Sequence, residues 1–212
     1  ATDVVGRLAE IWSGNSLEAF LDERIFTPLA MTDTGFEVKE ENRARFTSNY
    51  SVEEGILGPV LDAAATSHYL SPPEFVAGAG GLVSTADDYL QFLRMLLGRG
   101  ELNGHRIVKK ETFNLMIENH LVGDMADMGA GDFNDASWEG IGFGLGFNVV
   151  LDPLKTGSVA PAGEYGWTGA AGTVFFVHPE LNMATLLLTQ YMPSKTYPLR
   201  AEFRQAVYDG LI

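Results

Sequence analysis

Apolar residues recur at helical spacing at both ends of the chain. Near the beginning they follow the spacing i, i+1, i+4, i+7 and i+8, at Val4, Val5, Leu8, Ile11 and Trp12. This pattern predicts a helix over residues 2–13 that stops at Gly14. The same spacing at Phe203, Val207 and Leu211 predicts a closing amphipathic helix over 198–211. Similar patterns with capping residues predict a second helix from Ser16 to the Thr27-Pro28 break and a third over 85–97, and a further helix is expected near 110–119.

A different pattern fills the region between 143 and 190. Runs rich in Val, Phe, Leu and Thr over 173–178 and 183–190 are joined by the turn residues 179–182, which predicts a β-hairpin. A glycine-rich strand over 165–172 precedes it, and another strand is predicted over 143–151. Because glycines weaken a strand interior, Gly166, Gly169 and Gly172 indicate that another backbone or a ligand comes close.

The order of these elements predicts the fold class. Strands late in the chain, helices at both ends and few β-α-β alternations favour an α+β fold with an antiparallel sheet flanked by helices. Residues 37–77 are polar and irregular, and we expect a long connection there, of the kind that often forms a lid or binding loop. Residues 123–140 are expected to form a loop, and 153–163 a turn.

Composition excludes several functions. The 212 residues include 14 basic and 28 acidic side chains, a net charge of −14, which disfavours nucleic acid and anionic membranes as partners. The chain has no cysteine, so thiol catalysis and thiolate metal sites are excluded. No apolar run approaches the roughly 20 residues that span a bilayer. The sequence does not indicate a cellular compartment.

Metal and cofactor sites are not predicted. The four histidines lack the i, i+4 pairing of a zinc site. An acidic segment could suggest calcium, but its spacing does not fit an EF-hand loop, and a solvated loop is the preferred interpretation. That segment contains Asp124, Asp127, Asp132, Asn134 and Asp135. Glycines 78–81 are not followed by the lysine of a phosphate-binding loop.

Four segments together resemble a known family. They are PLAMTDTGF (28–36), GAGGLVSTADD (78–88), GFGLGF (142–147) and GWTG (166–169), and they span nearly the whole chain. In this order they resemble the C-terminal portion of the serine β-lactamase-like superfamily, in the branch of class C β-lactamases and family VIII carboxylesterases. The resemblance implies a β-lactamase/transpeptidase-like fold that is incomplete on its N-terminal side. Residues 1–212 would be part of one catalytic domain, with 1–140 mostly helices and loops and 141–212 the sheet strands and last helix.

Members of this superfamily use a nucleophilic serine in an S-x-x-K motif and a tyrosine motif. Serine needs a neighbouring base to take its proton, and the oxyanion that forms needs preorganised donors. No serine of this chain is followed by lysine three residues later. The resemblance therefore implies that both motifs lie in a missing N-terminal segment of the same protein, and that this piece alone is inactive. The chain begins at Ala1 without an initiator methionine or signal-peptide pattern, which favours a processed or truncated product.

The third family motif corresponds to Trp167, Thr168 and Gly169. The resemblance implies that these three residues bind substrate and that the backbone N–H of Ala170 is a catalytic oxyanion donor. Lactamases have lysine at the first position, whereas esterases often have tryptophan or histidine. Loss of the cation removes a partner for a β-lactam carboxylate, and tryptophan offers an apolar wall, so an ester substrate is favoured. A plain core strand with a glycine bulge is the alternative.

Two other segments imitate family motifs. Lys155-Thr156-Gly157 spells the lactamase motif, but it lies in a predicted turn rather than in a strand beside the site. Tyr50-Ser51 imitates the esterase tyrosine motif, but it comes after the second predicted helix, in the wrong order, and is interpreted as part of a loop.

The resemblance implies a serine hydrolase, a carboxylesterase that forms an acyl-enzyme, with a small ester or lactam as substrate and no cofactor. Two interpretations remain open beside it. The first is a β-lactamase or a non-catalytic penicillin-recognition protein that binds an acyl or peptide ligand without turnover. The second is an acidic structural domain.

Overall fold

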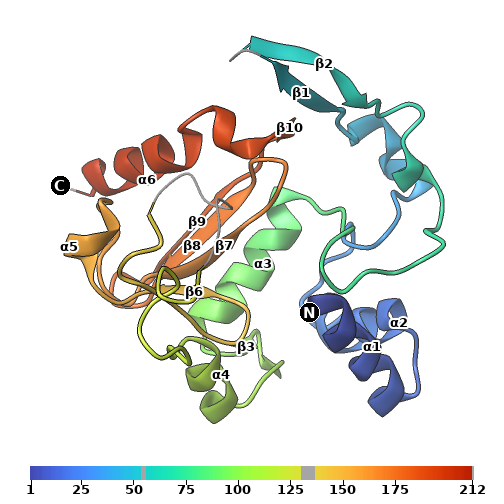
Figure 1. Ribbon diagram of the computed structural model, residues 1–212. Helices are drawn as coiled ribbons and strands as arrows, with labels where there is room; N and C mark the ends of the chain where they lie inside the picture. The colour runs from blue at the N-terminus through green and yellow to red at the C-terminus, as the bar shows by residue number, and fades with distance from the viewer. Residues whose placement is uncertain (54–55, 130–136, 212) are drawn as a thin grey trace.

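The computed structural model describes residues 1–53, 56–129 and 137–211. A five-stranded sheet dominates the second half of the chain (Figure 1). Its strands pair in sequence order, each antiparallel to the next. They are β5 (Ile141–Phe143), β6 (Asn148–Val150), β7 (Tyr165–Thr168), β8 (Val174–His178) and β9 (Met183–Leu187). Helices flank this sheet, so the α+β prediction is confirmed.

Strand β8 is buried along its whole length. Because side chains alternate across a strand, Phe175 and Phe176 point to opposite faces of the sheet. The ring of Phe175 contacts Tyr89 of helix α3 (Ala86–Leu97) at 5.6 Å between centroids. The ring of Phe176 contacts Phe203 of helix α6 (Leu199–Asp209) at 5.9 Å. The sheet is therefore covered by α3 on one face and by α6 on the other, as Figure 1 shows.

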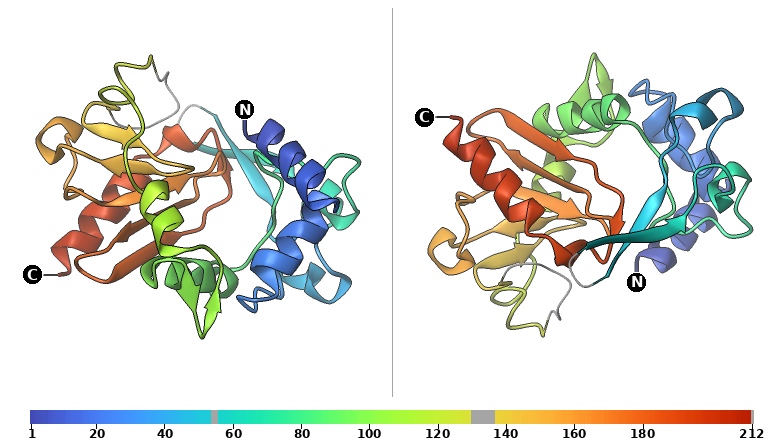
Figure 2. Two further views of the ribbon diagram at one scale, coloured as in Figure 1. Left: turned by 90° about the horizontal axis from the view of Figure 1, so that it is seen from below. Right: turned by 90° about the horizontal axis from the view of Figure 1, so that it is seen from above.

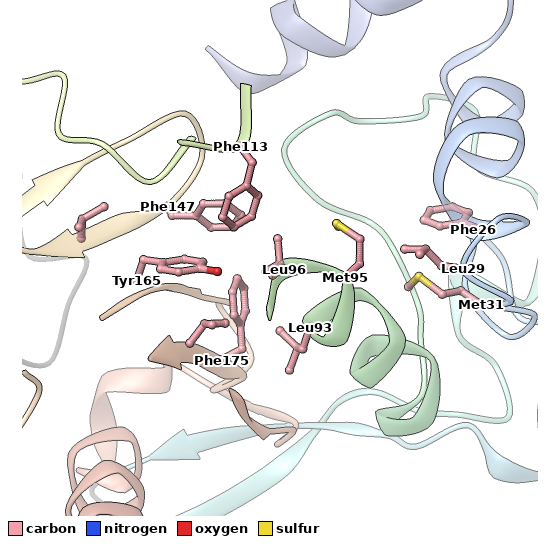
Figure 3. Close-up of a cluster of buried hydrophobic side chains, with 12 residues drawn as sticks. Phe26, Leu29, Met31, Leu93, Met95, Leu96, Phe113, Phe147, Tyr165 and Phe175 are labelled. Atoms are coloured by element: carbon pink, nitrogen blue, oxygen red, sulfur yellow. The ribbon is translucent and has the colours of Figure 1, made fainter. Parts of the chain in front are cut away.

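Helix α3 is the centre of the main hydrophobic core. Its Leu93 and Leu96 are fully buried, as the 3.6-residue spacing predicted, and Met95 is buried beside them. Figure 3 shows α3 between two groups of side chains: aromatic residues on the sheet side and Phe26, Leu29 and Met31 on the other. Helix α3 thus packs against both the N-terminal part of the chain and the sheet.

The N-terminal part begins with two short helical segments. Helix α1 (Thr2–Ser13) ends at Gly14 in the left-handed conformation, and α2 (Leu17–Leu21) is capped by the hydroxyl of Ser16 and continues as a π-helical turn (Asp22–Phe26). The apolar stripe of α1 faces outward, since Val4 is 63% exposed and Trp12 79%. Such an apolar face is typical of a surface that another chain segment or partner covers.

The prediction of an irregular connection over 37–77 is wrong. The segment contains strands β1 (Asn49–Glu53) and β2 (Ile56–Asp62), which pair antiparallel. Strand β1 also pairs in parallel with β10 (Tyr191–Met192) near the C-terminal end. Figure 2 shows this ribbon running between the part that holds α1 and α2 and the part that holds the sheet and α6. The pairing with β10 joins residues about 140 positions apart, which local sequence patterns do not reveal.

Other expected elements differ in their boundaries. The strand expected over 143–151 is split into β5 and β6, and the turn expected over 153–163 contains the short helix α5 (Pro153–Thr156). The helix expected over 110–119 is α4 (Lys110–Met116). The remaining short elements are β3 (Glu101–Leu102), β4 (His105–Arg106) and 3-10 turns at Glu40–Arg45, His68–Leu70 and Ser194–Thr196.

Helix α6 buries its apolar positions only in part: Phe203 and Val207 are half-buried, and Phe203 packs on Phe176. Leu211 is 54% exposed and lies beyond the end of the helix, whereas Arg200 in the first turn is only 5% exposed. Within the described residues, no helix combines the length and apolarity that crossing a membrane requires.

A buried carboxylate links the sheet to α6. Glu164, immediately before β7, is 2% exposed and accepts a hydrogen bond from the Tyr208 hydroxyl at 2.7 Å. Its other oxygen lies 3.0 Å from Nε of Arg204. Burial raises the pKa of Glu164, and the nearby Arg204 and Tyr208 offset only part of this effect. The folded state therefore holds a proton on Glu164 more tightly than the unfolded chain does.

This raised pKa predicts a pH-dependent loss of stability. Below the ordinary pKa of 4.5 Glu164 is protonated in both states, and its contribution is fully present. As pH rises through the higher folded pKa, that contribution is lost. We expect the free energy of unfolding of wild type to fall relative to that of Glu164→Gln, by on the order of 1 kcal/mol, between pH 4 and 8. Urea unfolding at each pH measures it.

The matched control is Glu202→Gln, which removes an exposed carboxylate from the same helix. Its stability should follow that of wild type across the same pH range. A difference between wild type and Glu164→Gln that does not change with pH contradicts the prediction.

The loop between β7 and β8 packs tightly against the chain that follows β9. Gly172 has φ +83°, and a Cβ at this position would meet Thr189 Oγ1 at 2.2 Å and the Tyr191 ring at 2.7 Å. Only glycine meets both conditions, because an L-residue is strained at this φ and there is no space for a side chain. Gly166, inside β7, lies equally close to a backbone, with Phe175 O 2.2 Å from its ideal Cβ.

We predict that Gly172→Ala destabilises the protein more than a glycine substitution with strain alone. The control is Gly157→Ala, at φ +62° with open space around it. The control should cost about 1 kcal/mol, and Gly172→Ala about 1–3 kcal/mol more, because overpacking adds to the strain. Urea unfolding midpoints of the two variants measure the difference, and equal midpoints would show that the contact with residues 189 and 191 is relaxed at no cost.

Candidate functional site

The exposed end of β7 carries the motif that sequence analysis singled out. Tyr165 and Trp167 are two residues apart, so their side chains share one face of the sheet. Tyr165 lies deep in the core at 2% exposure, whereas Trp167, one step closer to the strand end, is 38% exposed. Thr168 is half-buried beside it. Strand β7 is therefore held in the core by Tyr165 at its start and exposes the Trp167 ring near its end.

Two further aromatic rings extend the surface around Trp167. Trp138 stacks on it with 6.5 Å between ring centroids and 27° between planes. Phe143 of β5 meets its ring edge-on at 5.3 Å and 74°. Stacked and edge-to-face arrangements of this kind are favourable for aromatic rings. Together Trp138, Phe143 and Trp167 form an apolar wall, called the aromatic wall below.

The loop after β7 turns sharply around Ala170. The Gly169 N–H donates to Thr173 O at 2.9 Å, and the Gly172 N–H donates to Gly169 O at 3.2 Å. A Cβ at Gly169 would lie 2.2 Å from Thr173 Oγ1, so a side chain there would require that hydroxyl to rotate away. Ala170 itself is exposed, and no acceptor for its N–H lies in the described part of the chain. The turn thus leaves the Ala170 N–H outside the hydrogen bonds that the described residues form among themselves.

Two carbonyl groups of the same loop accept hydrogen bonds from residues that follow β9 or lie in α6. Ala171 O accepts hydrogen bonds from Thr189 Oγ1 at 3.0 Å and from the Tyr191 N–H at 3.2 Å. Gly169 O accepts a hydrogen bond from Nη2 of Arg200 in α6. The carbonyls before and after Ala170 thus both point into the protein, and the loop has little freedom to rotate.

The first two family-like segments pack against each other. Gly35 and Val83 exchange backbone hydrogen bonds of 3.1 and 2.8 Å. The buried carboxylate of Asp88, in the first turn of α3, accepts from the Asp33 N–H at 2.7 Å and from the Thr34 hydroxyl at 2.8 Å. An acidic side chain at a helix N-terminus is favourable because the helix dipole is positive there. These residues fix the position of α3, and they do not lie in the aromatic wall.

The other two family-like segments meet at the site. Asn148, directly after GFGLGF, pairs with Gly166 of β7 across the sheet, and Phe143 within it contacts Trp167. The imitation motif Lys155-Thr156-Gly157 forms the end of α5 and its C-cap, where Thr156 is buried and donates its hydroxyl hydrogen to Pro153 O at 3.0 Å. Tyr50 and Ser51 are in strand β1 rather than in a loop, and Ser51 donates its hydroxyl hydrogen to Pro59 O at 3.0 Å.

The acidic segment gives no metal centre among the residues that the structure describes. Asp124 accepts hydrogen bonds from the backbone of Asp127 and Gly140, which lower the pKa of its carboxyl group. Its carboxylate thus serves the loop itself. Asp132, Asn134 and Asp135, which also belong to the calcium alternative, lie outside the described residues.

Two residues of the site were missed by sequence reasoning. Trp138 was placed in a solvated loop, although a lone tryptophan at the end of an acid-rich segment is a signal of a packed contact. Arg200 is not part of the apolar pattern that predicts the last helix. A charged residue within the first turn of an amphipathic helix gives no local sign that it is buried.

Comparison with known proteins identifies the family. The β-lactamase family model matches residues 1–209. Protein Rv1367c of Mycobacterium tuberculosis is 35% identical over 205 residues, covering 91% of this chain and 48% of the relative. The esterase EstB of Burkholderia gladioli is 28% identical over 223 residues, covering 98% of this chain and 53% of EstB. The chain thus spans about half the length of these curated relatives.

Solved structures agree on the fold. The LovD6 mutant of simvastatin synthase (LovD) from Aspergillus terreus superposes with a TM-score of 0.81 at 24% identity, over 98% of this chain and 53% of that one. At this identity the likeness shows the fold. Together with the match over residues 1–209, it shows that the chain belongs to the β-lactamase family, the family that its four sequence segments resemble.

Proposed function

We propose that the complete protein is a serine carboxylesterase of the class C/family VIII branch that works through an acyl-enzyme. The observation that carries the proposal is the position of Trp167. It stands where lactamases of the family have a lysine, half-exposed, next to the turn that presents the Ala170 N–H. The esterase relative supports the same substrate class.

The chemistry at this position favours an ester over a β-lactam. A lysine would pair with the carboxylate that β-lactam antibiotics carry, and a hydrogen bond to a charged group contributes about 1.5–3 kcal/mol. Trp167 cannot supply that interaction. The aromatic wall instead offers apolar contact to the acyl or alcohol part of an uncharged ester. Thr168 and Gly169 complete the substrate-binding edge in this proposal.

In the proposed reaction a serine hydroxyl loses its proton to a base and adds to the ester carbonyl. The tetrahedral oxyanion accepts a hydrogen bond from the Ala170 N–H. Its collapse breaks the bond to the alcohol, which leaves with a proton, and water then hydrolyses the acyl-serine to the acid. We propose that the serine, its lysine and the tyrosine lie in polypeptide outside residues 1–212, because these residues contain no S-x-x-K and match only half of their relatives.

The test is a burst experiment on the complete protein. With p-nitrophenyl butyrate we expect a rapid release of about one equivalent of p-nitrophenol followed by slower turnover, because hydrolysis of the acyl-serine is expected to be slower than its formation from this activated ester. A chromogenic cephalosporin should be hydrolysed with a kcat/KM about tenfold to hundredfold lower. Residues 1–212 alone should show no turnover above background. Binding of either compound without turnover by the complete protein would favour a penicillin-recognition protein instead.

Substitutions at Trp167 test the aromatic wall. Trp167→Ala should raise KM for p-nitrophenyl butyrate about tenfold with little change in kcat, because apolar contact of several methylene equivalents is lost. Trp167→Phe keeps a flat ring and should stay within a few-fold of wild type. Trp167→Lys should shift the ratio of kcat/KM values toward the cephalosporin. Steady-state kinetics measure all three effects. An unchanged KM for Trp167→Ala would show that the Trp167 ring does not contact the substrate.

A further inference from the structure

Arg200 occupies an unusual position for a cation. It lies in the first turn of α6, close to the positive end of the helix dipole, and only 5% of the residue is exposed. Both conditions disfavour a positive charge there. The helix dipole favours an acidic residue in the first turn, and the exposed Glu202, two residues later, fits that preference. A specific interaction must therefore hold Arg200 in place.

The described interaction is with the loop after β7. Nη2 of Arg200 donates to Gly169 O, the carbonyl that directly precedes the Ala170 N–H. A trans peptide unit is planar, with its C=O and N–H pointing in opposite directions. Holding Gly169 O toward α6 therefore points the Ala170 N–H away from α6. Gly169 O also accepts the Gly172 N–H at 3.2 Å, and Ala171 O is held by Thr189 and Tyr191, so the turn on both sides of Ala170 is held in place.

We propose that Arg200 is a positioning residue that preorganises the Ala170 N–H as an oxyanion donor. The inference rests on the proposed function and adds a residue to it. Besides fixing the orientation, the guanidinium charge polarises the Gly169–Ala170 peptide and strengthens its N–H as a donor, because hydrogen bonds in a chain reinforce one another at low dielectric. An oxyanion donor acts mainly in the transition state, so this role predicts an effect on kcat rather than on KM.

The test uses Arg200→Met and Arg200→Lys in the complete protein, with p-nitrophenyl butyrate as substrate. Arg200→Met removes both charge and donor and should lower kcat about tenfold to hundredfold, with KM within about threefold of wild type. Arg200→Lys keeps the charge and one donor and should recover part of that loss. Affinity for butylboronic acid, whose tetrahedral adduct mimics the intermediate, should fall in parallel with kcat/KM.

The matched control is the double variant Arg204→Met with Glu164→Gln. It removes an arginine one turn later on the same helix, together with its buried partner 3.0 Å away. Thermal midpoints should change for this control, because a buried network is lost, while kcat and boronate affinity stay at the wild-type value. The comparison separates loss of helix packing from loss of orientation at Gly169.

The outcomes are distinct. If the wild-type protein neither releases p-nitrophenol nor binds the boronate, the proposed function is wrong, and the role proposed for Arg200 is wrong as well. An active wild type with Arg200→Met and Arg200→Lys both within twofold in kcat overturns this inference alone. So does a loss of kcat equal to that of the control, or one expressed only in KM. Arg200→Lys keeps the test decisive where methionine prevents folding.

Discussion

Burial of β8 on both faces is the constraint on which the rest of the structure depends. Phe175 packs toward α3 and Phe176 toward α6, so each face of the sheet must be covered by a helix. The neighbouring strand β7 is paired to β8 along its whole length, which fixes where its end emerges. The position of Trp167 and of the loop after it follows from this pairing. A shift of one residue in register would turn Trp167 to the other face.

At the candidate site the charged side chains are buried beneath the loop after β7, whereas apolar side chains and a backbone amide are exposed at the surface. The chain carries a net charge of −14, yet the aromatic wall is uncharged and the exposed donor is a backbone amide. The charged groups lie on the side of the sheet that α6 covers. Arg204 of α6 pairs with Glu164, and Arg200 of α6 donates to Gly169 O in the loop after β7. Rigid support of this kind fits the oxyanion donor that we propose at Ala170, because reorganisation during the reaction costs rate.

Local patterns predicted most of the helices and the three last strands of the large sheet, since these depend on apolar periodicity and turn residues. They failed where pairing is distant. Strand β1 is polar on much of its surface and pairs with β10 across about 140 residues, so the sequence indicated only an irregular segment. The strand expected over 143–151 is interrupted because Gly144 and Gly146 allow the turn between β5 and β6, which a run of mixed apolar residues conceals.

The sequence by itself indicated the family and pointed to the segment around Trp167, because four segments spread along the chain resemble the family's motifs in their order. Only the tertiary structure decided what surrounds it. Trp138 comes from a segment whose composition predicts a solvated loop, and Arg200 lies outside the apolar pattern of its helix. Their roles arise from packing between elements far apart in the chain, and contacts at that separation leave no periodic signal in the sequence.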